Sequence, residues 1–217
     1  MSTTKRGLFI TFEGPDGSGK STQLRILAAR LRAQGRTVVE TAEPGGTPIG
    51  TQIRRVLLDS KNLERRPTTE LLLMFAARAQ NVDETILPAL SRGEIVLSDR
   101  FTDSSLVYQG AARGLGPEVV YEVDRIACRG LVPDLTIVVD IETELGLARA
   151  RGRNQKTQDV ETRIDEQAVG FHRKVREAYL QLAADEMNRV RLVDGSRSEE
   201  SVGNDVWDAV LTVLRGP

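Results

Sequence analysis

The chain has 217 residues, of which 40% are apolar and 28% are charged, a composition typical of globular proteins and unlike that of collagen-like, disordered or disulfide-rich chains. Thirty basic residues against 31 acidic ones give a net charge of −1, which indicates neither a nucleic-acid-binding protein nor one that binds anionic membranes. The length predicts one domain over residues 1–217. We find one cysteine, no export signal and no apolar run long enough to span a membrane, so we expect a cytoplasmic protein.

Short apolar runs alternate along the chain with longer segments of helical period. Strands are predicted at residues 7–13, 37–43, 93–99, 134–141 and 189–194, and helices at 20–34, 69–91, 160–187 and around Trp207. This alternation favours an α/β fold in three layers, with a five-stranded, mainly parallel sheet between two layers of helices. A polar stretch, 149–163, lies between two helical segments, and a solvated loop and a mobile lid are both open interpretations of it.

The first predicted strand is followed by a glycine-rich turn that opens the first predicted helix. Its sequence matches G-x-x-x-x-G-K-[ST], the pattern of a phosphate-binding loop, or P-loop. Glycines let successive backbone N–H groups converge on phosphate oxygens, and the helix N-terminus adds a partial positive charge. Lys20 is expected to reach the outer phosphates, and the Ser21 hydroxyl is expected to bind Mg²⁺. We therefore predict that a nucleoside triphosphate binds at Gly14, Pro15, Asp16, Gly17, Ser18, Gly19, Lys20 and Ser21.

Polar and aromatic side chains follow the second and third predicted strands and lie on the helix between them. In a doubly wound sheet, ligands bind outside the carboxyl ends of the strands, so these side chains are expected to converge beside the P-loop. A guanine-specific switch would carry N-K-x-D for its base, and the sequence lacks this motif. The pattern therefore predicts a second ligand site next to the triphosphate. Its candidate residues are Glu43, Arg54, Met74, Phe75, Arg78, Arg100, Ser105, Tyr108 and Gln109.

Four segments carry most of these residues: FEGPDGSGKSTQ, EPGGTPIGTQIR, LLLMFAARAQ and SDRFTDSSLVYQG. In this order and at these intervals they resemble thymidylate kinases of the bacterial type, from Phe9 to about Asp194. The resemblance implies a P-loop nucleoside monophosphate kinase that transfers the γ-phosphoryl group of ATP to dTMP and gives dTDP and ADP. It also implies Mg²⁺ as the cofactor and a homodimer as the assembly.

The resemblance further implies roles for individual residues. Arg100, together with Arg54, would bind the phosphate of the acceptor. Asp16 and Glu43 would lie near the sugar or the metal-bound phosphates, with Asp16 beside Ser21 as a candidate metal ligand. The base and the deoxyribose would be contacted by Arg78, Ser105, Tyr108 and Gln109.

Two positions depart from the family pattern. The aromatic residue that usually stacks on the base is replaced by Met74, while Phe75 follows it directly, and either side chain is a candidate for this contact. Many relatives carry an arginine immediately before the Glu-Pro-Gly-Gly turn, where this chain has Ala42. The surroundings of Glu43 are therefore expected to differ from those in many relatives.

The mechanism follows from charge. A nucleoside monophosphate is largely dianionic at pH 7, so its oxygen is already a nucleophile and catalysis consists of positioning and neutralising two polyanions. Some family members place an arginine inside the P-loop, but this chain has Gly17 there. We therefore expect the stretch 149–163 to be a lid that brings Arg151 and Arg153 onto the transferring phosphoryl group, where they would act with Lys20 and Arg100.

Other functions remain open at this point. A kinase for another monophosphate, such as dUMP or CMP, would use the same groups, and a P-loop ATPase switch that binds a partner protein is the alternative outside the kinases. His172, the only histidine, is expected to be a surface residue because it precedes Arg173 in a helical segment.

Overall fold

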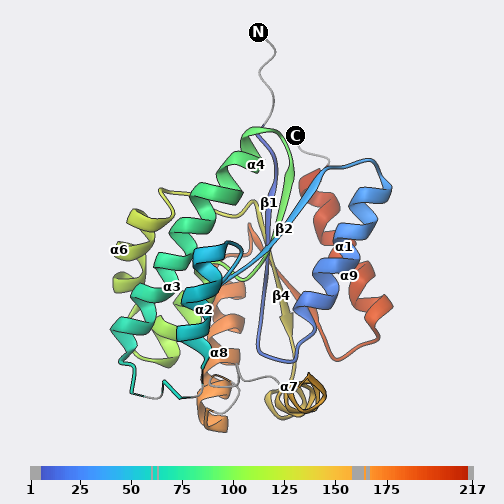
Figure 1. Cartoon of the computed structure of the whole chain (residues 1–217). Coiled ribbons are helices and arrows are strands. Elements are labelled where there is room, and N and C mark those ends of the chain that lie inside the picture. The colour runs from blue at the N-terminus through green and yellow to red at the C-terminus, as the bar shows by residue number, and fades with distance from the viewer. Residues whose placement is uncertain (1–5, 60, 63, 158–163, 165–166, 215–217) are drawn as a thin grey trace.

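A parallel β-sheet forms the middle layer of the molecule (Figure 1). The computed structural model describes residues 6–59, 61–62, 64–157, 164 and 167–214. The strand order is β2-β3-β1-β4-β5, and every neighbouring pair is parallel. Each strand lies within a predicted range, so the α/β class is confirmed and the described sheet is wholly parallel. The strands are β1 (Phe9–Glu13), β2 (Val38–Ala42), β3 (Ile95–Asp99), β4 (Leu135–Asp140) and β5 (Val190–Asp194).

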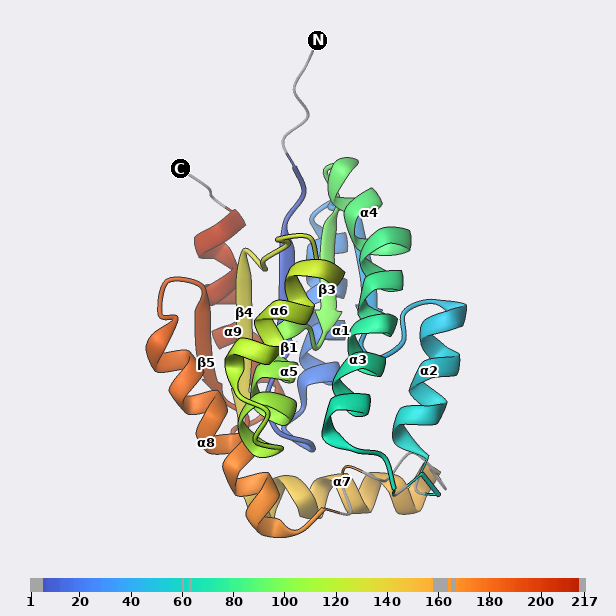
Figure 2. The same cartoon turned by 90° about the vertical axis from the view of Figure 1, so that its left-hand side faces the viewer.

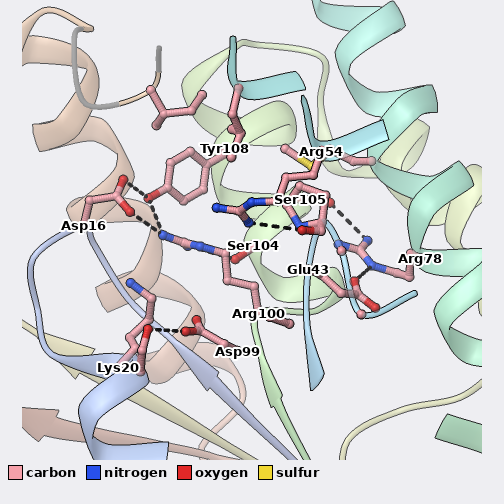
Figure 3. Close-up of a pocket in the computed structure, with 18 of the residues that line it drawn as sticks. Asp16, Lys20, Glu43, Arg54, Arg78, Asp99, Arg100, Ser104, Ser105 and Tyr108 are labelled. Atoms are coloured by element: carbon pink, nitrogen blue, oxygen red, sulfur yellow. Dashed lines mark hydrogen bonds and ion pairs between the residues drawn. The ribbon is translucent and has the colours of Figure 1, made fainter. Parts of the chain in front are cut away.

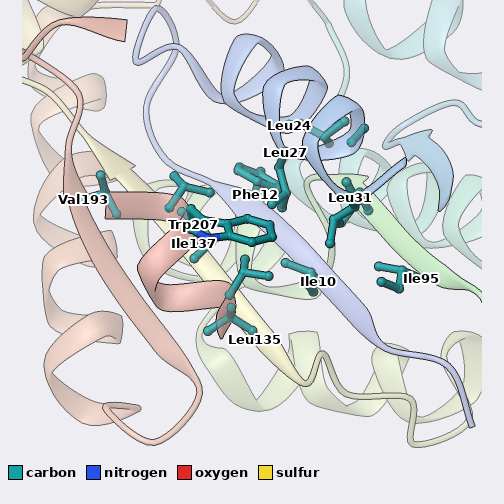
Figure 4. Packing of buried hydrophobic residues seen from close by; sticks show 14 of the residues in the cluster. Ile10, Phe12, Leu24, Leu27, Leu31, Ile95, Leu135, Ile137, Val193 and Trp207 are labelled. Carbon is teal, nitrogen blue, oxygen red and sulfur yellow. The ribbon is translucent and has the colours of Figure 1, made fainter. Parts of the chain in front are cut away.

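Helices α1 (Lys20–Ala33) and α9 (Glu199–Leu214) cover one face of the sheet. Because side chains alternate along a strand, Ile10 and Phe12 of β1 face these two helices, whereas Phe9 faces the opposite layer. Trp207 lies in this apolar cluster, close to Ile137 (Figure 4). Each large apolar side chain buried in this way stabilises the fold by about 1.5–3 kcal/mol. This packing fixes α1 against the sheet and so holds the P-loop at the carboxyl end of β1.

A longer series of helices covers the other face. Residues 67–91 form one continuous helical run, as the predicted helix 69–91 requires, with a π-helical segment in its middle. A second π-helical segment follows β3, and π-helical turns are frequent at functional sites. Phe9, Phe75 and Phe101 pack in the core between these helices and the sheet. The elements are α3 (Pro67–Asn81), η1 (Val82–Ile86), α4 (Leu87–Ser91), α5 (Thr102–Ser105), η2 (Leu106–Ala112), α6 (Pro117–Ala127) and α8 (Val169–Asp185).

Two helices lie at the rims of these layers. Helix α2 (Pro48–Leu58) begins at a cap in which the Thr47 hydroxyl accepts from the Gly50 N–H at 2.9 Å, and it packs against α3. Helix α7 (Thr143–Thr157) crosses the carboxyl edge of the sheet (Figure 2). Parallel strands end at the same edge, so the turns after β1, β2 and β3 meet at the edge that α7 crosses.

The loop interpretation of 149–163 is wrong for residues 149–157, which are helical. Residues 158–163 lie outside the described part of the chain. The stretch is polar, but Ala, Arg, Gln and Lys are good helix formers, and a polar sequence is compatible with an exposed helix. The predicted helix 160–187 is present from Val169 to Asp185.

His172 is another correction, because it is buried rather than on the surface. It shares its side of α8 with Val175 and Tyr179, which follow it at three and seven residues and are also buried. This helical spacing, not the neighbouring Arg173, indicates which way the histidine points. Within the described residues, no helix is both long and apolar enough to cross a membrane.

Candidate functional site

The P-loop connects the end of β1 to the first turn of α1. Gly17 has a φ of 77°, and a Cβ atom at this position would lie 2.0 Å from the Gly146 carbonyl oxygen in α7. An L-residue side chain therefore does not fit at position 17, which explains why no arginine stands inside this loop. The Lys20 ammonium donates to the Pro15 carbonyl at 3.0 Å. Burial and the nearby Arg100 lower the pKa of Lys20 to about 8.

Ser21 and Asp99 bring two oxygen ligands together beside the P-loop. Phe12 of β1 is in register with Asp99 of β3, so the end of β3 lies next to the start of α1. The Ser21 hydroxyl donates to the Asp99 carboxylate. A hydroxyl and a carboxylate are the hard oxygen ligands that Mg²⁺ prefers, and Mg²⁺ commonly takes only one or two carboxylates with the substrate's phosphates. These two residues therefore fit a magnesium ion, and Asp99 is a metal-ligand candidate that the sequence analysis missed.

A cavity of about 800 Å³ extends from the P-loop along the carboxyl edge of the sheet, large enough for two small ligands. The structure brings most of the predicted site residues to its wall. Of the described residues in the predicted site, Gly14, Pro15, Ser18, Phe75 and Arg151 do not line it. Those that do are Asp16, Gly17, Gly19, Lys20, Ser21, Glu43, Arg54, Met74, Arg78, Arg100, Ser105, Tyr108, Gln109 and Arg153.

Arg100 lies at the centre of this cavity, in a backbone conformation that is rare for arginine. Its φ is 75°, in the left-handed region. The guanidinium donates to Asp16 at 2.7 Å and to the Tyr108 hydroxyl at 3.2 Å (Figure 3). Tyr108 in turn donates to the other Asp16 oxygen at 3.1 Å. Burial opposes ionisation of Asp16, but Arg100 and Lys20 outweigh it and lower the pKa of Asp16 to about 2.

This arrangement separates Asp16 from its expected metal role. Both carboxylate oxygens of Asp16 already accept from protein donors at the centre of the cavity. The carboxylate that contacts Ser21 is that of Asp99. Asp99 reaches Ser21 through the pairing of β1 with β3, although the two residues are far apart in the sequence.

Arg78 forms the far wall of the cavity and is almost fully buried. Its Nε donates to Glu43, one of its terminal nitrogens donates to Ser105 at 3.0 Å, and the other donates to the Phe101 carbonyl at 2.9 Å. Burial alone would lower the pKa of Arg78, but the Glu43 carboxylate reverses this effect and raises it. A fixed positive charge on the cavity wall suits the carbonyl oxygen of a planar ligand.

Comparison with known proteins decides the family. Residues 12–206 match the family model of thymidylate kinase. The chain belongs to the thymidylate kinase family. The thymidylate kinase of Geotalea uraniireducens is 48% identical over 209 residues, which cover 96% of this chain and 98% of that protein. The thymidylate kinase of Deinococcus radiodurans is 47% identical, over 94% of this chain and 97% of that protein.

A solved structure agrees with this result. The crystal structure of thymidylate kinase from Ehrlichia chaffeensis superimposes with a TM-score of 0.76 at 28% identity, covering 95% of this chain and 99% of that one. The P-loop NTPase fold and the enzyme class, a transferase that phosphorylates dTMP, are confirmed.

Helix α7 decides which arginines of this thymidylate kinase face the cavity. Arg149 and Arg153 line the cavity wall, and they lie four residues apart on one face of the helix. Arg151, two residues after Arg149, lies on the opposite side of the helix and is exposed. Arg149 also donates to the Gly195 carbonyl at 3.0 Å. The sequence analysis expected Arg151 and Arg153 at the phosphates. Because the stretch is a helix, Arg149 and Arg153 line the cavity wall instead, and Arg151 does not.

The structure also distinguishes Met74 from Phe75. Met74 lines the cavity, whereas Phe75 is buried in the core, where the Arg78 guanidinium lies 4.4 Å from its ring centre. Of the two candidates for the base contact, Met74 is therefore the one on the cavity wall, whereas the Phe75 ring packs against Arg78. Consecutive residues of a helix point about 100° apart, so only one of the two reaches the cavity.

Glu13, the last residue of β1, is a further site residue that the sequence analysis missed. It is fully buried, and its carboxylate accepts from the Phe101 N–H at 2.8 Å, the Ser104 hydroxyl at 2.5 Å and the Tyr179 hydroxyl at 2.8 Å. Burial, with Asp103 nearby, raises the pKa of Glu13 to about 7. Glu13 thus holds the turn that carries Arg100. The sequence could have indicated Glu13, because this glutamate ends an apolar strand immediately before the P-loop.

Proposed function

We propose that this chain transfers the γ-phosphoryl group of ATP to dTMP with the help of Mg²⁺, and that the cavity from the P-loop to Arg78 holds both nucleotides. The observation that carries the proposal is the continuous wall from Lys20 through Arg100 to Arg78, in a chain that belongs to the thymidylate kinase family. The P-loop would hold the phosphates of ATP. Ser21 and Asp99 would hold Mg²⁺, which supplies charge neutralisation at the phosphates.

The acceptor would lie along the rest of the cavity. Arg100 and Arg54 would bind its phosphate, and Asp16 with Tyr108 would lie against the sugar. Both Arg54 and Arg100 line the cavity, and the Arg54 guanidinium donates to the Pro44 carbonyl at 3.1 Å. The base would lie against Met74 and be recognised by Arg78, Ser105 and Gln109.

Catalysis would rest on charge and position, without a general base. The acceptor phosphate is largely dianionic at pH 7 and attacks directly once the two phosphates are in line. Lys20, Arg100 and Arg153 would neutralise the charge on the transferring group. Arg149, one helical turn before Arg153, would support the phosphates from the same face of α7.

A coupled ADP-release assay over a panel of nucleoside monophosphates tests the proposal. We expect dTMP to be the preferred acceptor. Preference for another monophosphate, such as dUMP or CMP, would contradict the substrate. Slow ATP hydrolysis that no monophosphate accelerates would support the ATPase switch instead. Chelating Mg²⁺ should abolish transfer, and full activity without a divalent cation would remove the metal from the proposal.

The assembly that we propose is a homodimer through the outer surface of α2, α3 and α6. Helix α2 packs against α3, and α3 against α6, in one layer (Figure 2). Ile49 on α2, Leu72 on α3 and Ile126 on α6 are large apolar side chains that are exposed. Sedimentation equilibrium should give twice the chain mass, and Leu72→Glu should give a monomer. A monomeric wild-type chain would contradict the proposed assembly.

We propose the cytoplasm as the site of action. The single cysteine, Cys128, is buried, and burial raises the pKa of its thiol, so it is neither a disulfide partner within the chain nor a reactive thiolate. Cell fractionation tests this location, and recovery of the protein in the membrane fraction would contradict it.

A further inference from the structure

Glu70, in the first turn of α3, lies in a buried polar cluster beside the cavity. Its side chain is almost completely buried. One carboxylate oxygen accepts from the Gln109 side-chain amide at 2.8 Å and lies 3.4 Å from Nε of Arg113. The other lies 3.5 Å from a terminal nitrogen of Arg113 and 3.7 Å from one of Arg65. Two guanidinium groups therefore balance a carboxylate that does not itself line the cavity.

The two arginines keep this carboxylate in place from both sides. Arg65 donates to the Leu57 carbonyl at 2.6 Å, near the end of α2. Arg113 donates to Gln167 at 2.9 Å and stacks over the Phe171 ring with 4.5 Å to its centre. Glu70 is thus fixed against η2, α2 and the start of α8. Because the Glu70 carboxylate has these partners, it has little freedom to move when the side-chain amide of Gln109 rotates.

The contact with Glu70 determines how the Gln109 amide is turned. An ionised carboxylate only accepts hydrogen bonds, so the NH₂ group of Gln109 must face it and the carbonyl oxygen Oε1 must point away. Gln109 is buried but lines the cavity, and among the described residues no donor reaches its Oε1. Oε1 of the amide is therefore a hydrogen-bond acceptor that a ligand can use.

The neighbouring groups complete a recognisable pattern. Arg78 and the Ser105 hydroxyl lie on the same wall, and Arg78 is a fixed donor. Donors beside an acceptor complement a pyrimidine with a 4-oxo group and an N3–H. A 4-aminopyrimidine carries a donor at position 4 and an acceptor at N3, so it places donor against donor and acceptor against acceptor. Such mismatches leave buried polar groups unpaired, which is costly.

We propose that Glu70 is a positioning residue that selects 4-oxopyrimidine acceptors over 4-aminopyrimidine acceptors by locking the Gln109 amide with its oxygen toward the base. The inference rests on the proposed function, since it places the acceptor base against Gln109. Glu70 itself touches no substrate. Without the lock, the Gln109 amide could turn over and offer its NH₂ group to the N3 atom of a cytosine.

The test compares Glu70→Gln with the wild-type chain on dTMP, dUMP and dCMP. The new side chain keeps the shape but can donate or accept, so it no longer dictates the orientation of Gln109. We expect the ratio of kcat/KM for dTMP to kcat/KM for dCMP to fall by at least about tenfold. The dTMP to dUMP ratio should stay unchanged, because both bases present the same edge, and kcat on dTMP should change less than about threefold.

Two further variants separate positioning from structure. Exchange of the two residues, Glu70→Gln with Gln109→Glu, again presents an acceptor to the cavity and should restore the preference. Gln109→Leu removes both amide groups, leaves the Glu70 ion pairs in place, and should reduce the preference as Glu70→Gln does, which covers the case in which Glu70→Gln does not fold. The exposed Glu84→Gln, on η1 of the same helical run, is the matched control and should match the wild type.

The outcomes are distinguishable. A wild-type chain that does not phosphorylate dTMP would contradict the proposed function. A wild-type chain that does, combined with an unchanged dTMP to dCMP ratio in Glu70→Gln or in Gln109→Leu, would overturn only the role of Glu70. An equal fall in kcat/KM for all three acceptors would mean that Glu70 is merely structural, and would overturn it as well.

Discussion

At one end of the cavity, the consecutive residues 14–21 would bind the triphosphate, whereas the acceptor end collects side chains from the ends of β2 and β3 and from α2, α3 and η2. The first region would act through backbone N–H groups and the ammonium of Lys20. The second would act through arginines, two of which are paired with carboxylates: Arg78 with Glu43 and Arg100 with Asp16.

The difference has a consequence for mutation. Among the described residues, the Lys20 ammonium donates one hydrogen bond, to a carbonyl of its own loop, so its loss should leave the fold intact. Arg78 and Glu43 are a buried ion pair, so the loss of either side chain leaves an unpaired charge in the core. Function and stability should therefore be separable at the triphosphate end and coupled at the acceptor end.

The largest effect is expected from Lys20→Ala. Without the ammonium, the charge on the transferring phosphoryl group lacks its P-loop counter-ion, so transfer should be abolished. The thermal unfolding midpoint should stay at the wild-type value, and Lys174→Ala, an exposed lysine on α8, is the control. Retained activity in Lys20→Ala would show that the P-loop lysine is not needed for transfer. A large loss of stability would contradict the proposal that function and stability are separable at the triphosphate end.

The next largest effect is expected at Arg153 of α7, and it should exceed the effect at Arg151. Arg153→Ala should lower kcat by roughly 10³, the scale of an arginine that stabilises phosphoryl transfer, with little change in ATP binding. Arg151→Ala is the matched variant, two residues away on the far side of the helix, and should lower kcat far less. Steady-state kinetics of both variants measure the ratio. Equal losses of kcat in the two variants would show that the face of α7 on the cavity wall does not determine which arginine assists phosphoryl transfer.

Glu43→Ala tests the acceptor end. The buried Arg78 would lose its counter-ion, so the free energy of unfolding should fall by about 3–5 kcal/mol. Urea unfolding followed by fluorescence of Trp207 measures it. The control is Glu94→Ala, which breaks the Arg92–Glu94 pair at the surface and should have no measurable effect on stability. A Glu43→Ala chain as stable as the wild type would show that the acceptor end is not built on its ion pairs.

Glu13 joins the two ends, and it makes stability depend on pH. Its pKa is raised to about 7 in the folded chain from the ordinary value of 4.5. Between these values the folded state keeps a proton that the unfolded state has lost, so stability falls as the pH rises from about 4.5 through 7, by a total of about 3 kcal/mol. Urea unfolding at a series of pH values measures this slope, and Glu13→Gln should reduce it. An identical slope in the variant would assign the dependence to other groups.

Much of the fold could be predicted from local patterns. Five apolar runs gave five strands, and the glycine spacing at 14–21 gave the P-loop, because both are set by backbone geometry and by side chains close together in sequence. The sequence does not assign the side of α7 that faces the cavity, because its polar residues 149–157 do not by themselves indicate a helix. Helical period then separates Arg149 and Arg153 from Arg151 without further information.

The composition of the site shows the same division. The P-loop, the Glu-Pro-Gly-Gly turn and the Asp-Arg pair at the end of β3 are contiguous motifs, and they identify the family from the sequence alone. Strand pairing placed Asp99 rather than Asp16 against Ser21, packing turned Phe75 into the core and Met74 outward, and a buried cluster attached Gln109 to Glu70. Contiguous motifs act through a backbone that the sequence specifies directly. Contacts between distant residues exist only after the sheet has brought its strand ends to one edge, and they depend on burial, which no local pattern reports.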